Sequence, residues 1–476
     1  MIGLKNSLTK NGFAMIIKEE IKNIVSEFEV LHSGQFASVV AAAPAFLKNI
    51  YNQSIAKFKS IGLPNRKNEN YKYLDIANLF TKNYEKAITP TQVKVDINDI
   101  FKCDVPELDT NAIIILNGFY FSPDGNKINI LPSGAVVGSL AQAIIDYPEL
   151  VEKYLNKSAE KSDEGLVALN SAFIQDGVFI YVPKDAKLEK PLQIIHLMME
   201  AKSIMAQHRN LFVFEEGSEG KVVICDHSLS PSEFLTNSVS EIFADEKAKI
   251  EVVRMQNEHN SSKQLTNTFI DQQKDSDVII NTLTLHGGTV RNNLFVNLND
   301  EGCQNRAYGL NLTDRNQQVD NYVYINHAKP NCHSTQLYKG VLDDEAKGAF
   351  SGRIFVAPDA QKTEAFQNNN TMLLTDDAQM RSKPQLEIYA DDVKCSHGST
   401  SGQLDEDALF YMKARGIGDK EARMLLMFAF AHEIISKISV EPLFERVNNL
   451  VEKRLRGEMS RCNNCMMACD TNQKNN

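Results

Sequence analysis

Apolar triplets recur through the middle of the chain at a nearly constant spacing. From about residue 110 to 400, short apolar runs alternate with turns rich in Asp, Glu, Asn, Gly and Pro, which is typical of short strands. The centres of successive triplets are 26 to 32 residues apart. These centres are Val213, Ile242, Phe269, Phe295, Val323 and Phe355.

A unit of this size holds two or three strands and cannot bury an apolar face by itself, so we expect the units to stack. The pattern predicts a mostly β protein with a β-helix (solenoid) core. A β-sandwich would show similar spacing over two or three strands, and a propeller blade needs roughly 40 residues or more. Asparagines that recur just before the triplets indicate stacked turn asparagines; they are Asn210, Asn237, Asn267, Asn293 and Asn321.

Helical periodicity flanks this β region. The polar stretch before Met15 makes residues 1–14 a candidate for a mis-assigned or frayed start. A helical interruption is expected at roughly 139–175. Three further helices follow the solenoid; such helices can cap its open end, and they can present a groove or knob to another protein. Those helices are predicted at Asp405–Arg415, closed by Gly416, at Asp419–Ile438, capped by Asp419, and from Ser439 to Arg456 with Pro442 in the first turn. The predicted regions are an N-terminal helical region (1–85), a β-helix core (86–402), a C-terminal helical region (403–456) and a Cys-rich flexible tail (457–476).

Composition narrows the class of protein. The 476 residues carry a net charge of −10, and Lys and Arg are scattered, which argues against a nucleic-acid or membrane-surface partner. Neither a membrane-spanning apolar run nor a signal peptide is evident, so a cytoplasmic location is expected. In a reducing compartment the eight cysteines are expected to be free, buried or metal-linked; they are Cys103, Cys225, Cys303, Cys332, Cys395, Cys462, Cys465 and Cys469.

The usual enzyme signatures are absent. The sequence contains no phosphate loop, no dinucleotide fingerprint, no zinc-protease helix motif and no nucleophile elbow. Asp391 and Asp392 could form a carboxylate pair for acid–base chemistry, but adjacent strand residues point to opposite faces. His227 near Cys225, and His333 beside Cys332, are more often structural than metal-binding.

The stretch from Leu386 to Gly402 is the strongest candidate site. It begins with the alternation of a half-buried strand and ends in Gly398–Gly402, whose composition predicts a tight loop. Between them lie Cys395 and His397, a Cys-x-His pair suited to iron, copper(I) or zinc.

A second thiol cluster lies in the tail. Cys462, Cys465 and Cys469 have the spacing Cys-x-x-Cys-x-x-x-Cys, which lets a short loop bring three sulfurs to one metal or cluster. The alternative is an oxidisable tail without metal.

Several segments together resemble the SufB/SufD scaffold family of iron–sulfur cluster assembly. They are Phe350–Val356, Thr363–Gln367, Leu386–Gly402, Leu404–Asp405, Leu409–Tyr411 and Ala414–Ile417. The sequence Cys-Ser-His-Gly at 395–398 is similar to the SufD branch. The N-terminal motif Gly62–Tyr73 is similar to that of the same branch, with Tyr71 where the family commonly has Trp. The resemblance covers residues 15 to 456 and leaves the tail outside.

The resemblance implies a right-handed parallel β-helix between two helical regions, and a chain that is not an enzyme and binds no nucleotide. It implies pairing with a SufB-like subunit, and a transient iron–sulfur cluster or iron shared with that subunit at Cys395 and His397. It also implies docking of a SufC-like ATP-binding-cassette ATPase on the C-terminal helices; the matching positions are Asp405, Phe410, Tyr411, Arg415, Gly416, Met424 and Phe428. A homodimer is possible in isolation.

Two other classes stay open at this point. A β-helix carbohydrate-active enzyme would need a cleft lined by acids and aromatics, and the absence of Trp argues against it. A self-associating structural solenoid without a metal role would form stable homodimers.

Overall fold

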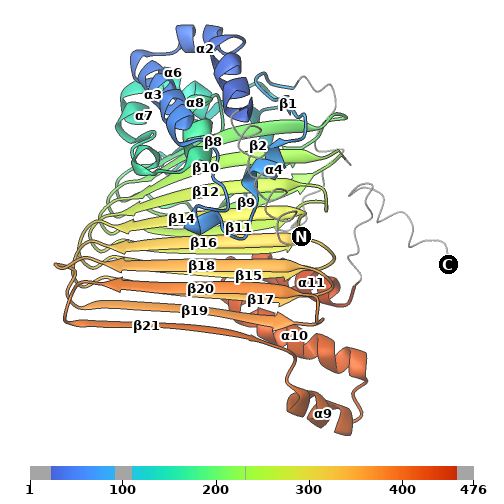
Figure 1. The fold of residues 1–476 in the computed structure, drawn as a ribbon. Coiled ribbons are helices and arrows are strands. Elements are labelled where there is room, and N and C mark those ends of the chain that lie inside the picture. Colours follow the sequence, from blue (N-terminus) through green and yellow to red (C-terminus); the bar gives the residue numbers. More distant parts are fainter. Residues whose placement is uncertain (1–22, 92–109, 231, 458–476) are drawn as a thin grey trace, which may run out of the picture.

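Two stacked β-sheets form the body of the protein in the computed structural model, which describes residues 23–91, 110–230 and 232–457. From β6 onward the strands alternate between the two sheets, so each turn of the chain adds one strand to each sheet (Figure 1). All these neighbouring strands run parallel. This is the predicted β-solenoid.

The first sheet contains β4 (Ile128–Ile130), β5 (Val136–Ser139), β6 (Val178–Val182), β8 (Ile204–Phe214), β10 (Phe234–Ala244), β12 (Lys263–Gln272), β14 (Thr289–Leu298), β16 (Gln318–His327), β18 (Lys347–Val356) and β20 (Gln379–Ile388), with β1 (Glu85–Lys86) beside β8. The second sheet contains β3 (Phe119–Phe121), β2 (Asn111–Leu116), β7 (Leu192–Met198), β9 (Glu219–Ser228), β11 (Lys249–Asn257), β13 (Asp277–His286), β15 (Gln304–Thr313), β17 (His333–Leu342), β19 (Thr363–Leu373) and β21 (Val393–Gly402).

The apolar triplets all fall on the first sheet, in β8, β10, β12, β14, β16 and β18. Phe269 and Phe295 lie directly in register, and their rings stack with centroids 4.8 Å apart. The repeat of 26 to 32 residues is therefore one full turn of two strands, as the spacing predicted.

Strand alternation gives the solenoid one interior and two outer faces. Phe212 and Phe214 of β8 lie in the interior core, whereas Leu211 and Val213 of the same strand pack outward against the N-terminal helices. The asparagines before the triplets lie within strands, so the prediction that they occupy turns is wrong. Asn293 Nδ2 donates to Asn267 Oδ1 of the neighbouring strand at 2.8 Å, which satisfies buried amides along the stack.

The same backbone conformation and hydrogen bond recur at one corner of each turn of the solenoid. A residue with left-handed φ, between 55° and 73°, donates its N–H to a carbonyl of the next turn. These residues are Asp185, Gly217, Lys247, Asp275, Gly302, Asn331 and Lys362. A small buried residue follows each of them from Gly217 onward and forms what we term the corner column: Ser218, Ala248, Ser276, Cys303, Cys332 and Thr363.

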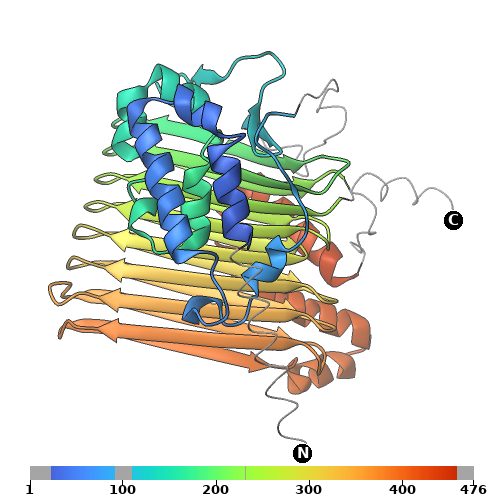
Figure 2. The ribbon, with the colours of Figure 1, turned by 45° about the horizontal axis from the view of Figure 1, so that its top comes forward.

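A layer of helices lies on the outer face of the first sheet at β8 and β10, where α8 (Gly165–Ala172) contacts both strands and α3 (Ala45–Ile61) packs on α8 (Figure 2). The N-terminal helices are residues 23–33, α2 (Ala37–Ala42), α3, η1 (Glu69–Tyr71), which lies at β14, and α4 (Ile76–Phe80). The predicted interruption supplies α6 (Leu140–Asp146), α7 (Pro148–Tyr154), η2 (Ala159–Lys161) and α8 (Gly165–Ala172), which confirms it.

The C-terminal helices are α9 (Glu406–Ala414), α10 (Asp419–Ile435) and α11 (Glu441–Leu455). They do not cap the open end, so the first of the two roles suggested for them is wrong. Ile434, Ile435 and Leu443 pack instead against apolar residues on the outer face of the second sheet, such as Leu310 and Val341. The apolar helix faces meet an equally apolar sheet face, and no described helix or strand covers the β20–β21 end (Figure 1).

One predicted helix cap is also wrong, and one helix begins two residues later than predicted. The N-cap of α10 is Gly418, and the side chain of Asp419 pairs with Lys413 and Arg423 instead. The helix α11 begins at Glu441, after its N-cap Val440, and the backbone N–H of Ser439 before it donates to Glu251 at 2.9 Å. In the described part of the chain, no helix has the length and apolar character needed to cross a membrane.

Candidate functional site

Cys395 and His397 lie on β21, the last strand of the second sheet. The predicted loop at Gly398–Gly402 is wrong, because these residues continue β21 in register with β19. Small polar residues are typical of loops, but ladder hydrogen bonds to β19 hold this segment extended.

The register shows which way the two side chains face. Cys395 pairs with Ala365 and His397 pairs with Gln367, and both β19 residues are fully buried. Gln367 Nε2 donates to Gln336 Oε1 at 2.7 Å inside the solenoid. Cys395 and His397 therefore face the interior column where it reaches the open end. Cys395 packs against an apolar cluster that includes Ile354, while His397 is exposed.

The environment of Cys395 keeps its thiol protonated. Burial raises the pKa of Cys395 above its ordinary value, and a backbone hydrogen bond at Ala365 opposes this only in part. A metal ion that binds this sulfur must therefore displace a proton.

The described residues hold no complete candidate ligand set for a metal. Across residues 23–91, 110–230 and 232–457, no group of three or more His, Cys, Asp or Glu side chains is arranged to hold a metal. Asp391 and Asp392 precede β21 in the turn and are exposed. The backbone of Asp392 closes that turn, since its carbonyl accepts from Lys362 N at 2.6 Å and its N–H donates to Gln361 Oε1 at 2.9 Å. Two candidate ligands, a thiol and an imidazole, thus lie two residues apart on the outermost strand of the second sheet.

Comparison with known proteins identifies the family. The profile described as "SUF system FeS cluster assembly, SufBD core domain" matches residues 197–430, and "SufBD protein N-terminal region" matches residues 22–194. The chain belongs to the SufBD family. This confirms the resemblance seen in the sequence, and it favours iron–sulfur cluster assembly over the carbohydrate-active alternative.

Relatives align over most of their length. An iron–sulfur cluster assembly SufBD family protein of Synechocystis is 29% identical over 404 residues, which is 83% of this chain and 88% of the relative. The iron–sulfur cluster assembly protein SufD of Escherichia coli is 27% identical over 416 residues, covering 85% and 92% of the two chains. SufD of Bacillus subtilis is 24% identical over 434 residues, covering 87% and 95%.

The predicted docking residues of this SufBD protein divide into exposed and buried groups. Phe410 and Tyr411 of α9 are 75% and 57% exposed, and Arg415 lies over the Tyr411 ring at 4.2 Å. Asp405 caps α9 through the amides of residues 407 and 408, and Gly416, with φ of 88°, ends that helix region. Met424 is buried in the core between α10 and the second sheet, so its placement on a docking surface is wrong. Phe428 is half-buried and packs on His432. The tail residues Cys462, Cys465 and Cys469 lie outside the described residues.

A polar cluster inside the solenoid was not foreseen. His196 Nδ1 and Asp226 Oδ1 are 2.7 Å apart, and Arg254 donates twice to Asp226, at 2.8 and 3.1 Å. Burial lowers the pKa of His208 well below its ordinary value. Burial, with the charge of Asp226, raises the pKa of Glu258 to about 8. These five residues are spread over more than 50 positions of the sequence, and no local motif joins them.

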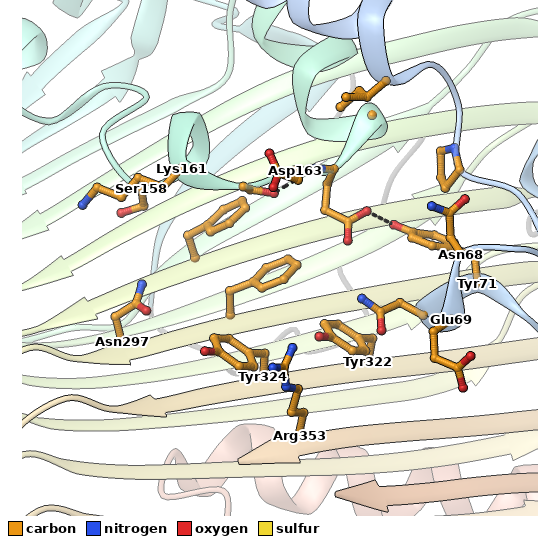
Figure 3. A pocket seen from close by; sticks show the side chains of 18 of the residues that line it. Asn68, Glu69, Tyr71, Ser158, Lys161, Asp163, Asn297, Tyr322, Tyr324 and Arg353 are labelled. Carbon is orange, nitrogen blue, oxygen red and sulfur yellow. Dashed lines mark hydrogen bonds between the residues drawn. The ribbon is translucent and has the colours of Figure 1, made fainter. Parts of the chain in front are cut away.

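A cavity of about 790 Å³ opens on the outer face of the first sheet, away from β21. Figure 3 shows Tyr322, Tyr324 and Arg353 along its lower part, and Tyr71 above and to the right of Tyr322. Tyr71 Oη donates to Glu164 at 2.7 Å and accepts from Asn293 at 3.0 Å, and the Arg291 guanidinium lies 4.3 Å from its ring. Tyr71 therefore ties the Gly62–Tyr73 motif to the sheet.

Proposed function

We propose that this chain is a non-catalytic, cytoplasmic scaffold subunit of an iron–sulfur cluster assembly complex. In this proposal its open solenoid end pairs with a SufB-like subunit, and Cys395 and His397 contribute to a site where iron or a nascent cluster is held transiently. The observation that carries the proposal is the position of these two ligands, which face the interior column on the last strand with no third ligand nearby in the described residues.

The chemistry of the pair suits iron as a cargo. A thiolate and an imidazole are both iron ligands, and the two missing positions of a tetrahedral site would come from the second subunit. Edge strands β20 and β21 support this arrangement, because a further chain can extend a sheet only where its outermost strand is uncovered.

The second part of the proposal concerns a SufC-like ATPase. The sequence contains no phosphate loop, so nucleotide would be bound by that partner rather than by this chain. Phe410 and Tyr411 form an exposed aromatic pair on α9, and aromatic residues are enriched at protein interfaces. Lys339 of β17 donates to the carbonyl of Phe430 at 3.1 Å, which fixes α10 to the second sheet and could carry movement of the helices into the solenoid.

A substitution at His397 tests the cluster site. We expect His397→Ala, coexpressed with SufB-like and SufC-like subunits, to assemble normally but to hold several-fold less iron and sulfide. Ser396→Ala on the same strand is the matched control, because Ser396 pairs with Phe366 and faces the other side. Full iron and sulfide content in His397→Ala would contradict the role of the imidazole. A homodimer of the isolated chain that persists when the SufB-like subunit is added would contradict the pairing.

A further inference from the structure

Two cysteines occupy neighbouring places in the corner column. Cys303 and Cys332 precede β15 and β17, and their following residues, Gln304 and His333, are paired in register. His333 N donates to the carbonyl of Cys303 at 2.9 Å, so Cys332 lies one turn above Cys303. Neighbouring strands are about 4.8 Å apart, which is within the Cα separation of about 4.4–6.8 Å that a disulfide requires.

The two thiols share the same surroundings. Each Sγ lies within hydrogen-bond distance of the carbonyl oxygen of Asp300, at 3.1 Å for Cys303 and 3.2 Å for Cys332. The thiols also hydrogen-bond to each other, and this bond lowers the pKa of Cys303 and raises the pKa of Cys332. Cys303 is therefore the thiol of the pair that ionises more readily, and Cys332 lies beside it.

The other cysteines of the described residues do not stand in register with a second cysteine. Cys225 lies in register with Ile195 and Met255, and Cys395 lies in register with Ala365. The corner column elsewhere holds Ser, Ala or Thr, so a small side chain is all that packing requires there. Packing alone therefore does not explain why two neighbouring places in the column are both cysteine.

We propose that Cys303 and Cys332 form a redox-active dithiol, a modification site that a peroxide converts to a disulfide between successive turns of the solenoid. The thiolate of Cys303 attacks one peroxide oxygen, the O–O bond breaks, and water leaves after protonation. The Cys332 sulfur then displaces the hydroxyl of the sulfenic acid, which leaves as a second water. The two sulfurs lose two electrons and the peroxide gains them.

The disulfide would act on a chain of backbone hydrogen bonds that reaches the edge of the solenoid. Asn331 N donates to the carbonyl of Gln361 at 3.0 Å, and Lys362 N donates to that of Asp392 at 2.6 Å. Asp392 is three residues before Cys395 on the outermost strand. Oxidation would thus stiffen the corner that supports this strand. The inference does not depend on the proposed function.

Peptide mapping of the oxidised full-length chain tests the proposal. The native protein is treated with hydrogen peroxide, quenched in acid, alkylated in denaturant and digested without reductant. We expect a crosslinked peptide pair containing Cys303 and Cys332 in the majority of chains, and its complete loss after dithiothreitol. Recovery of both cysteines in alkylated form after peroxide treatment would overturn the proposal.

Single variants distinguish the cysteine that reacts with peroxide, Cys303, from the cysteine that then forms the disulfide, Cys332. Cys332→Ser is expected to leave Cys303 as a sulfenic acid that dimedone traps, whereas Cys303→Ser is expected to leave Cys332 reduced. Serine already occupies the column at Ser218 and Ser276, so both variants should fold. Cys225→Ser is the matched control and should retain the crosslink. Equal oxidation of Cys332 with and without Cys303 would also overturn the proposal.

Discussion

Arg209 and Glu241 form an ion pair in which neither side chain reaches solvent, with Nη2 and Oε2 2.7 Å apart. Glu241 also accepts hydrogen bonds from the backbone amides of Asn156 at 2.7 Å and Ser158 at 2.9 Å. One carboxylate therefore joins β8, β10 and the segment between α7 and α8. The helical layer is fixed to the first sheet by charge as well as by apolar packing.

Removing this carboxylate should destabilise the fold. Glu241→Gln leaves a buried guanidinium without its counter-charge, which typically costs about 3–5 kcal/mol. We expect a reduction of that size in the free energy of unfolding measured with urea. Glu246→Gln, at an exposed pair with Lys247, serves as the control and should leave the transition unchanged. Equal transitions for the two variants would contradict the structural role of Glu241.

Glu258 should make stability fall as the pH rises. Burial, followed by repulsion from Asp226, raises its pKa in the folded chain to about 8, above the ordinary value of 4.5. Between these values the folded state binds more protons than the unfolded state, so its stability declines with increasing pH. Glu258→Gln removes this contribution. Between pH 5 and pH 8 the free energy of unfolding of the variant should therefore rise, relative to that of the native chain, by a few kcal/mol in order of magnitude. Unfolding curves that shift in parallel over this range would show that Glu258 does not titrate as expected.

The exposed aromatic pair on α9 gives a direct test of ATPase docking. Phe410 is 75% exposed, so Phe410→Asp should leave the melting temperature of the isolated chain unchanged. We expect the variant to lose most of the copurifying SufC-like ATPase, because a charge in an apolar contact must be desolvated without a partner. Ile145→Asp is the control, since Ile145 is 70% exposed on α6 near the other end of the solenoid. Equal ATPase recovery with both variants would exclude this face of α9.

The tail cysteines call for a separate measurement. Replacing Cys462, Cys465 and Cys469 together by Ser should remove most of the iron or zinc bound after anaerobic purification, if the three thiolates converge on one metal. His397→Ala measured in parallel distinguishes tail-bound metal from metal at the open end. Unchanged metal content in the triple variant would assign the tail no metal role.

The solenoid could be predicted from the sequence because every turn repeats the same packing requirement. Phe269 and Phe295 must meet the same outer face one turn apart, so their spacing records the length of a turn. The position of the C-terminal helices could not be predicted in this way. An amphipathic helix shows that it covers an apolar surface, but Ile434 and Ile435 carry no information about whether that surface is the end or the side of the solenoid.

The candidate site shows a similar division. Cys395 and His397 could be recognised from residue type and spacing, and their common face from the two-residue period of a strand. The extended conformation of Gly398–Gly402 depends on the neighbouring strand β19, which the local composition does not reveal. The contacts of Tyr71 with Glu164 and Asn293 join residues 93 and 222 positions apart, and no local pattern predicts them.

The uncovered β20–β21 end has a consequence for recognition. A strand that continues either sheet would be held mainly by amide and carbonyl groups, which are the same in every polypeptide. The affinity of this edge for an added strand therefore comes mainly from backbone groups, and these groups do not select one partner over another. Choice must come from the few side chains along the rim, among them Tyr389, which is 61% exposed and packs on Phe355 with 5.5 Å between ring centroids. Rim side chains can diverge between relatives and change the selectivity of the edge while the fold behind it stays intact.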